Sequence, residues 1–181
     1  MKKKIRWITE TGIMLALLVT LQALTKPLGQ LVTGSCVNTI LAVSALVGGL
    51  GCGLTVAVIS PILAFLLGIA PQILTVPAIM AGNAVFVVLL SLLADKTGKN
   101  MVKQVIAWVA SAAAKFATLY VIVVKIICGV MAPSLLAAGT LKEPMLKALP
   151  ATFSWPQLFT ALIGGAIALL IVPVLKKALH R

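Results

Sequence analysis

The sequence predicts an all-α membrane protein. Residues 1–181 are expected to form one domain, a compact bundle of six transmembrane helices with both termini in the cytoplasm. Hydrophobic residues make up 61% of the 181 residues, whereas soluble domains average about 45–50%. The length allows about six spans of roughly 20 residues each, with little left over except connections. Basic residues also gather at alternate connections, which is the pattern that orients membrane helices.

The first span is expected over residues 5–25. A basic stretch from Lys2 to Arg6 precedes it. The apolar run that follows is longer than the core of a signal peptide, which is about 7–15 residues. We therefore interpret it as a retained span. The sequence KPLG at residues 26–29 is expected to end this helix.

Two further spans are expected over residues 36–47 and 54–69. The apolar stretch 36–70 is too long for one straight span and short for two. A glycine-dense segment at 48–53 (GGLGCG) and Pro61 favour two helices joined by a turn.

The remaining apolar stretches predict three more spans. A polar turn separates the first two of them, and a long connection with four prolines precedes the last. This connection is expected to contain a short amphipathic helix. The expected ranges are 78–93, 104–129 and 157–175 for the spans, 95–100 for the turn, 132–156 for the connection and 141–149 for the short helix.

The distribution of basic residues predicts the orientation. Ten of the fifteen Lys and Arg residues lie before the first span, between the fourth and fifth, or after the sixth. The alternate connections carry only Lys26, Lys142 and Lys147. Both termini are therefore expected in the cytoplasm, which requires an even number of crossings. The connections expected outside are residues 26–35, 70–77 and 132–156.

The fifth span carries a polar stripe inside an apolar stretch. At 100° per residue its five polar residues fall within roughly 80° of one another on a helical wheel. A charge that faces lipid costs at least about 2.5–3.5 kcal/mol, so this face is expected to meet protein, water or a ligand. The stripe consists of Gln104, Ser111, Lys115, Thr118 and Lys125.

Further polar residues are expected near the outer ends of the spans. Asn38 lies near the start of the second span and Asn83 about 8 Å below the outer boundary of the fourth, at 1.5 Å per residue. Gln72 and Trp155 lie in outer connections. Together with Lys115 and Lys125 they predict a substrate site in which lysine meets an anion, amides form hydrogen bonds and tryptophan stacks. The alternative is interhelical hydrogen bonding for the asparagines, snorkelling for Lys125 and an aromatic belt for Trp155.

Catalysis is not expected. The single histidine, His180, lies one residue from the C-terminus, and the chain has only three acidic residues, so no nucleophile–base pair is predicted within the spans. No P-loop segment and no spacing typical of a metal site occur, and no cofactor is expected. The net charge of +12 is interpreted as orientation signals and contact with anionic lipid, not nucleic-acid binding.

Small residues form a second pattern. Gly12, Ala16 and Ala23 share one face of the first span with Thr9, and Thr20 lies beside them. Similar small-residue faces occur in the second and sixth spans. Small residues let helices approach closely. Such a face either packs inside this chain or docks another membrane subunit.

These features resemble the substrate-binding S components of energy-coupling factor (ECF) vitamin transporters, over nearly the whole chain. Residues 12–20 (GIMLALLVT) look like the Ala-x-x-x-Ala motif of the family's first span, with Gly and Thr where Ala is usual. Residues 33–41 (TGSCVNTIL) and 81–85 (AGNAV) also look like family segments.

The resemblance implies a mechanism. An S component captures a vitamin or related micronutrient outside the bacterial cytoplasmic membrane. It then docks on a transmembrane T component that is bound to two ATPases, and Gly12, Ala16 and Thr20 would form the docking face. The substrate stays open: the lysines favour a carboxylate or phosphate, such as pantothenate, but a neutral pyrimidine or thiazole precursor also fits. Two other hypotheses are a self-sufficient secondary transporter of a small anionic metabolite and a structural or pore-forming protein.

Overall fold

The computed structural model describes residues 2–69, 72–95 and 100–179. Within these ranges the chain is helical with short connections and contains no strand. Six helical segments are long and apolar enough to cross a membrane, which confirms the predicted fold class. The helices are α1 (Lys2–Thr25), α2 (Gln30–Val47), α3 (Gly49–Leu66), α4 (Val76–Leu93), α5 (Met101–Leu119), α6 (Ala132–Ala137), α7 (Glu143–Thr152) and α8 (Trp155–Ala178), with 3₁₀ turns at Lys26–Leu28 and Ile73–Thr75 and a π-helix, η3, at Tyr120–Val130.

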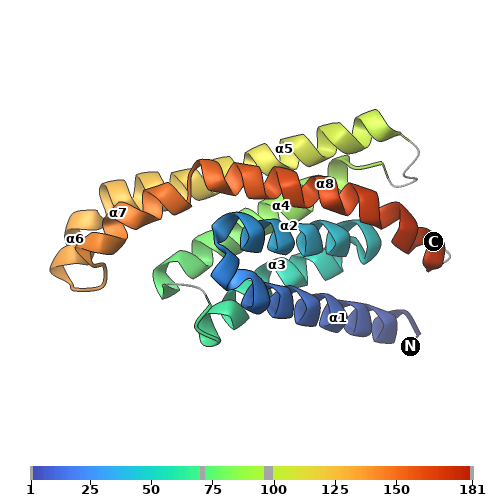
Figure 1. The fold of residues 1–181 in the computed structure, drawn as a ribbon, viewed down its shortest axis with the longest axis horizontal. Helices are drawn as coiled ribbons and strands as arrows, with labels where there is room; N and C mark the ends of the chain where they lie inside the picture. Colours follow the sequence, from blue (N-terminus) through green and yellow to red (C-terminus); the bar gives the residue numbers. More distant parts are fainter. Residues whose placement is uncertain (1, 70–71, 96–99, 180–181) are drawn as a thin grey trace.

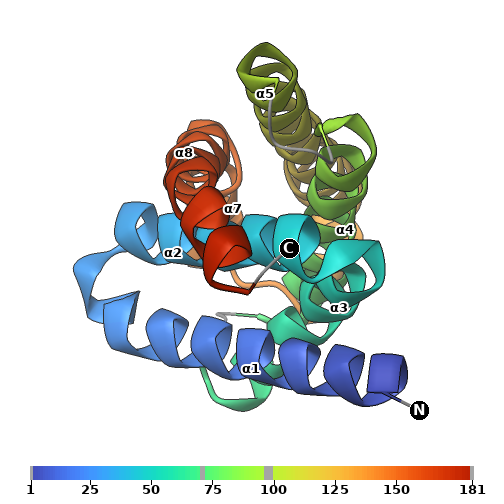
Figure 2. The ribbon, with the colours of Figure 1, turned by 90° about the vertical axis from the view of Figure 1, so that its right-hand side faces the viewer.

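Helix α2 lies in the middle of the bundle and contacts α1, α3, α4 and α8. Helix α1 lies at the periphery (Figure 2), where it packs only against α2, α3 and the turn that follows it among the main contacts of the described residues. Only 11% of its span is buried inside the protein, compared with 44% for α2. The start of α1 and the end of α8 lie at the same end of the bundle (Figure 1), as an even number of crossings requires.

Glycines bring α8 and α2 into direct contact. A Cβ atom added to Gly164 would lie 2.6 Å from the Asn38 Cβ and 2.6 Å from the Ser35 carbonyl oxygen. One added to Gly34 would lie 2.7 Å from a Thr160 side-chain carbon. The small-residue face of the sixth span therefore packs inside this chain, since close backbone approach is what small residues allow.

The break between α2 and α3 is shorter than the sequence predicts. It consists of Gly48 alone, and α3 starts at Gly49, which adopts a φ of +84°. That left-handed conformation costs glycine little. The glycine at Gly53 is needed for packing, because an added Cβ would lie 2.7 Å from the Val87 side chain. Helix α2 also begins at Gln30, six residues before the expected start of the second span.

The fifth span changes its helical type at Tyr120. Residues 101–119 are α-helical, and residues 120–130 form a π-helix. A π-helix closes its hydrogen bonds from i to i+5, so its turns are wider than those of an α-helix. Side chains after residue 119 therefore no longer follow the 100° spacing used to draw the predicted stripe.

Candidate functional site

A cavity of about 180 Å³ lies at the end of the bundle remote from the start of α1 and the end of α8. Its wall comes from the ends of α1, α5 and α7, the starts of α2 and α8 and the first half of α4. Apolar side chains such as Val37, Ile79 and Leu119 line part of it. The polar residues used below are Gln22, Lys26, Thr33, Asn38, Asn83 and Lys115.

Lys115 forms the polar centre of this cavity. Its side chain is only 3% exposed. The Nζ atom donates to the Oδ1 of Asn38 at 2.6 Å and to the Oδ1 of Asn83 at 2.7 Å. The Phe86 ring centroid lies 5.6 Å from Nζ, a distance at which the ring face attracts a cation. An ammonium has three N–H donors, so two amide oxygens leave one donor for another acceptor.

Asn38 is held in one orientation by three neighbours. Its Nδ2 donates to the Gly34 carbonyl oxygen at 2.8 Å and to the Thr160 Oγ1 at 3.2 Å, so its Oδ1 is left for Lys115. The Thr160 hydroxyl in turn donates to the Gln157 carbonyl oxygen at 3.1 Å. The contact between α2 and α8 therefore fixes one of the two acceptors of the lysine.

Close packing of α4 and α5 brings Asn83 to Lys115. A Cβ atom added to the neighbouring Gly82 would lie 2.7 Å from the Cγ of Leu119. Helix α4 thus approaches α5 within one residue of Asn83, and Lys115 lies one helical turn before Leu119. Both contacts that hold the lysine depend on glycines that no larger residue can replace without movement.

A second lysine lies in the wall of the cavity, in the turn after α1. The Lys26 Nζ donates to the Gly68 carbonyl oxygen at 2.6 Å and is solvent-exposed. It ties the α1–α2 turn to the end of α3. Among the described residues that line the cavity, the ionisable ones are lysines and none is acidic. The cavity therefore has a positive potential, which attracts anions.

Thr33 adds an unsatisfied group to the wall. Its Oγ1 is buried and has no hydrogen-bond partner in the described part of the chain. Buried hydroxyl groups nearly always have a partner. Because Thr33 lines the cavity, a molecule bound there can supply this partner.

The structure brings together three of the six predicted substrate residues, Asn38, Asn83 and Lys115. The predicted stripe holds as far as Lys115, because Gln104 and Ser111 are also buried. Lys125 departs from it and is exposed, with its Nζ 5.7 Å from the Tyr120 ring centroid. The expected shared face for Lys125 is therefore wrong, and the π-helix that contains Lys125 is the physical reason.

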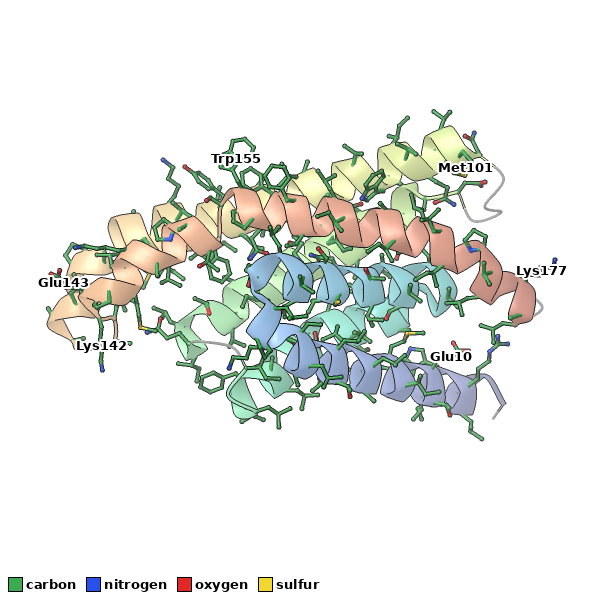
Figure 3. The ribbon with its side chains drawn as sticks, viewed as in Figure 1. Glu10, Met101, Lys142, Glu143, Trp155 and Lys177 are labelled. Atoms are coloured by element: carbon green, nitrogen blue, oxygen red, sulfur yellow. The ribbon has the colours of Figure 1, made fainter. Side chains whose placement is uncertain are left out.

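Trp155 and Gln72 also lie outside the lining of this cavity. Trp155 is 62% exposed and stacks on Phe116, with 5.6 Å between ring centroids. It lies on the outer surface of the bundle (Figure 3). The Gln72 Nε2 is 3.4 Å from the Thr140 carbonyl oxygen, so Gln72 connects the chain before α4 to the α6–α7 connection.

Sequence reasoning missed Lys26, Thr33 and Gln22 as lining residues. The first two were assigned to a connection, since α2 was expected to begin at residue 36. The signal that could have found them is a polar cluster at a helix junction, around the KPLG segment at residues 26–29.

The small-residue face of α1 differs from those of α2 and α8. Gly12, Ala16 and Thr20 are all exposed, and a Cβ added to Gly12 would meet no atom within 4 Å. In α8, by contrast, Gly164 and Ala161 are buried. The face of α1 is therefore not used for packing inside the described chain.

We expect Lys125→Ala to leave ligand affinity within about twofold, because surface substitutions away from a site have small effects. Equilibrium dialysis with a small molecule that native mass spectrometry identifies on the purified chain would measure this. A loss of tenfold or more would show that Lys125 reaches the ligand in another conformation.

A family model described as "ECF transporter, substrate-specific component" matches residues 6–176. Comparison with curated proteins and with solved structures found no match. The match covers the six candidate membrane spans except the first two residues of the first span and the last two of the sixth.

Proposed function

The chain belongs to the family of ECF transporter substrate-specific components, and from this premise we propose that it captures a vitamin or related small micronutrient for an ECF-type importer of the bacterial cytoplasmic membrane. The cavity around Lys115 is proposed as the capture site, with Asn38 and Asn83 as the other polar contacts. The substrate enters from outside, since the positive-inside rule predicts that this end of the bundle faces the exterior.

The observation that carries this proposal is the burial of the Lys115 ammonium at the cavity, with two neutral amide oxygens as its hydrogen-bond acceptors. A lysine buried in a membrane bundle marks a functional site by default, because exposing or burying a lone charge there is costly. Here the lysine is held by two amides at the edge of an open cavity. Such an arrangement of a few polar groups in a partly apolar cavity is typical of small-molecule sites.

Delivery is proposed to depend on partners. The chain docks on a T component bound to two ATPases, and these partners use the ATP. The exposed face of Gly12, Ala16 and Thr20 on α1 supports this step, because small residues that pack against nothing in the described chain are free to receive another helix.

The test is transport in liposomes. The solute is a small molecule that native mass spectrometry identifies on the purified chain. We expect the chain alone to bind this solute but not to accumulate it, and the chain with T component, both ATPases and ATP to accumulate it. Uptake by the chain alone, driven by an ion gradient, would contradict the proposal. That result would favour a self-sufficient secondary transporter of a small anionic metabolite.

A further inference from the structure

We infer that the cavity takes a small monoanionic carboxylate, which accepts a hydrogen bond from Lys115 and supplies its counter-charge. This inference rests on the proposed function only in assuming that the cavity is the capture site. It concerns the chemistry of the ligand, which the family alone leaves open.

The acidic side chains of the protein do not supply a counter-charge to Lys115. The whole chain has three acidic residues, Glu10, Asp95 and Glu143. Glu10 pairs with Arg6 at 2.8 Å, and the Asp95 Oδ2 accepts from the Asn100 backbone N–H at 3.0 Å. Glu143 starts α7, and Figure 3 shows it at the opposite end of the molecule from Glu10. None of these three carboxylates lines the cavity.

The two amide side chains that contact Lys115 are uncharged. Asn38 and Asn83 offer neutral oxygens, which satisfy hydrogen bonds but do not cancel the charge of Lys115. A buried charge is expected to be paired. The third N–H of Lys115 needs a hydrogen-bond acceptor, and its charge needs a counter-charge. An acceptor that carries one negative charge provides both.

The volume and the charge of the cavity limit the size and the charge of the ligand. An apolar cavity of about 150 Å³ is known to hold benzene, so about 180 Å³ takes a molecule near the size of one ring with a substituent. Lys115 is the one buried ammonium of the described lining, because Lys26 is solvent-exposed and donates to the Gly68 carbonyl oxygen. One buried ammonium balances one negative charge, which matches a carboxylate better than a phosphate of about −1.5 to −2. Val37, Ile79 and Leu119 provide apolar wall for the rest of the ligand.

The experiment compares acids with their neutral amides. Benzoate and benzamide, and nicotinate and nicotinamide, would be titrated by calorimetry into the purified full-length chain in nanodiscs. We expect at least one acid to bind at least tenfold tighter than its amide. The same affinity for acid and amide in both pairs, or no binding of either acid, would overturn the inference.

The decisive variant is Asn83→Asp, which has the same shape and keeps an oxygen for Lys115. It supplies the counter-charge from inside the protein. We expect it to raise the midpoint of thermal unfolding and to weaken binding of the acid about 100-fold, the scale expected when a buried charge loses its partner. Unchanged acid affinity in Asn83→Asp would overturn the inference.

The matched control is Asn100→Asp, which makes the same chemical change at the exposed N-cap of α5. The Asn100 Oδ1 accepts from the Lys103 backbone N–H at 3.0 Å, and aspartate caps helices equally well. We expect acid affinity within about twofold of the natural chain. A comparable loss in this control would assign the effect to net charge and overturn the inference.

A second variant, Lys115→Met, checks the charge directly. It is expected to remove the preference for acid over amide, even where it lowers stability, since the ratio within one variant does not depend on the folded fraction. Retention of the preference would overturn the inference. The proposed function is tested separately. Preference for acid over amide without ATP-dependent uptake would contradict the proposed function alone. ATP-dependent uptake of a neutral substrate without that preference would contradict the inference alone.

Discussion

Gly164→Val is expected to separate α8 from α2, to destabilise the protein by about 3 kcal/mol or more and to abolish ligand binding. Overpacking in a tight core typically costs about 1–3 kcal/mol, and more where nothing can move. An added Cβ would lie 2.6 Å from the Ser35 carbonyl oxygen and 2.8 Å from the Thr39 backbone nitrogen. These are backbone atoms in the middle of a helix, so the helix as a whole has to shift.

The effect on binding follows from the same contact. Asn38 lies against Gly164, and its amide holds one of the two hydrogen bonds of Lys115. A shift of α8 also moves Thr160, to which the Asn38 Nδ2 donates. Misplacing one polar acceptor around a buried charge costs more than an ordinary hydrogen bond. We therefore expect binding to fail even in the fraction of molecules that stay folded.

Gly12→Val is the control, because it makes the same substitution inside a helix where an added Cβ meets no atom within 4 Å. The intrinsic helix propensity changes equally in both variants. The midpoint of thermal unfolding and the ligand affinity would be measured for both in the same detergent. Equal effects of the two variants would show that the α2–α8 contact is not tight in the purified protein.

The number and order of the spans could be predicted because long apolar runs have few alternatives in a bilayer. The two helices over residues 30–66 are harder to tell from one long span. A glycine cluster separates them, and basic residues at both ends of the chain require an even number of crossings. The start of α2 was missed by six residues. Polar residues such as Gln30 and Thr33 look like a connection in the sequence, whereas they form the first turn of a helix that lines the cavity.

The site was predictable only where the helix was regular. Lys115 could be identified because a charge in an apolar span needs an explanation, and the two asparagines because they lie at similar depth on neighbouring spans. Lys125 could not be placed, since nothing in its surrounding apolar residues signals the π-helix that turns it outward. Trp155 was assigned to the ligand from its residue type, but its partner is the Phe116 ring.

Ala16→Trp is expected to lower the rate of ATP-dependent uptake at least tenfold, while ligand affinity and the midpoint of thermal unfolding stay unchanged. Ala16 is exposed on α1, in the middle of the face that begins at Gly12 and ends at Thr20. Because Ala16 is exposed, we expect the fold to tolerate a large side chain at this position. A partner helix that approaches small residues closely is held away, because close approach is the basis of such contacts.

Leu17→Trp is the matched control for docking. Leu17 is 45% exposed on the same helix, and it lies 100° further round than Ala16. Both variants place the same tryptophan side chain at an exposed position in the same turn of α1, so the two variants present the same large side chain to lipid. If the small-residue face docks the T component, uptake in liposomes falls for Ala16→Trp and persists for Leu17→Trp, and co-purification of the T component follows the same order. If Ala16→Trp retains full uptake, the T component docks on another surface. The small-residue face of α1 then contacts lipid.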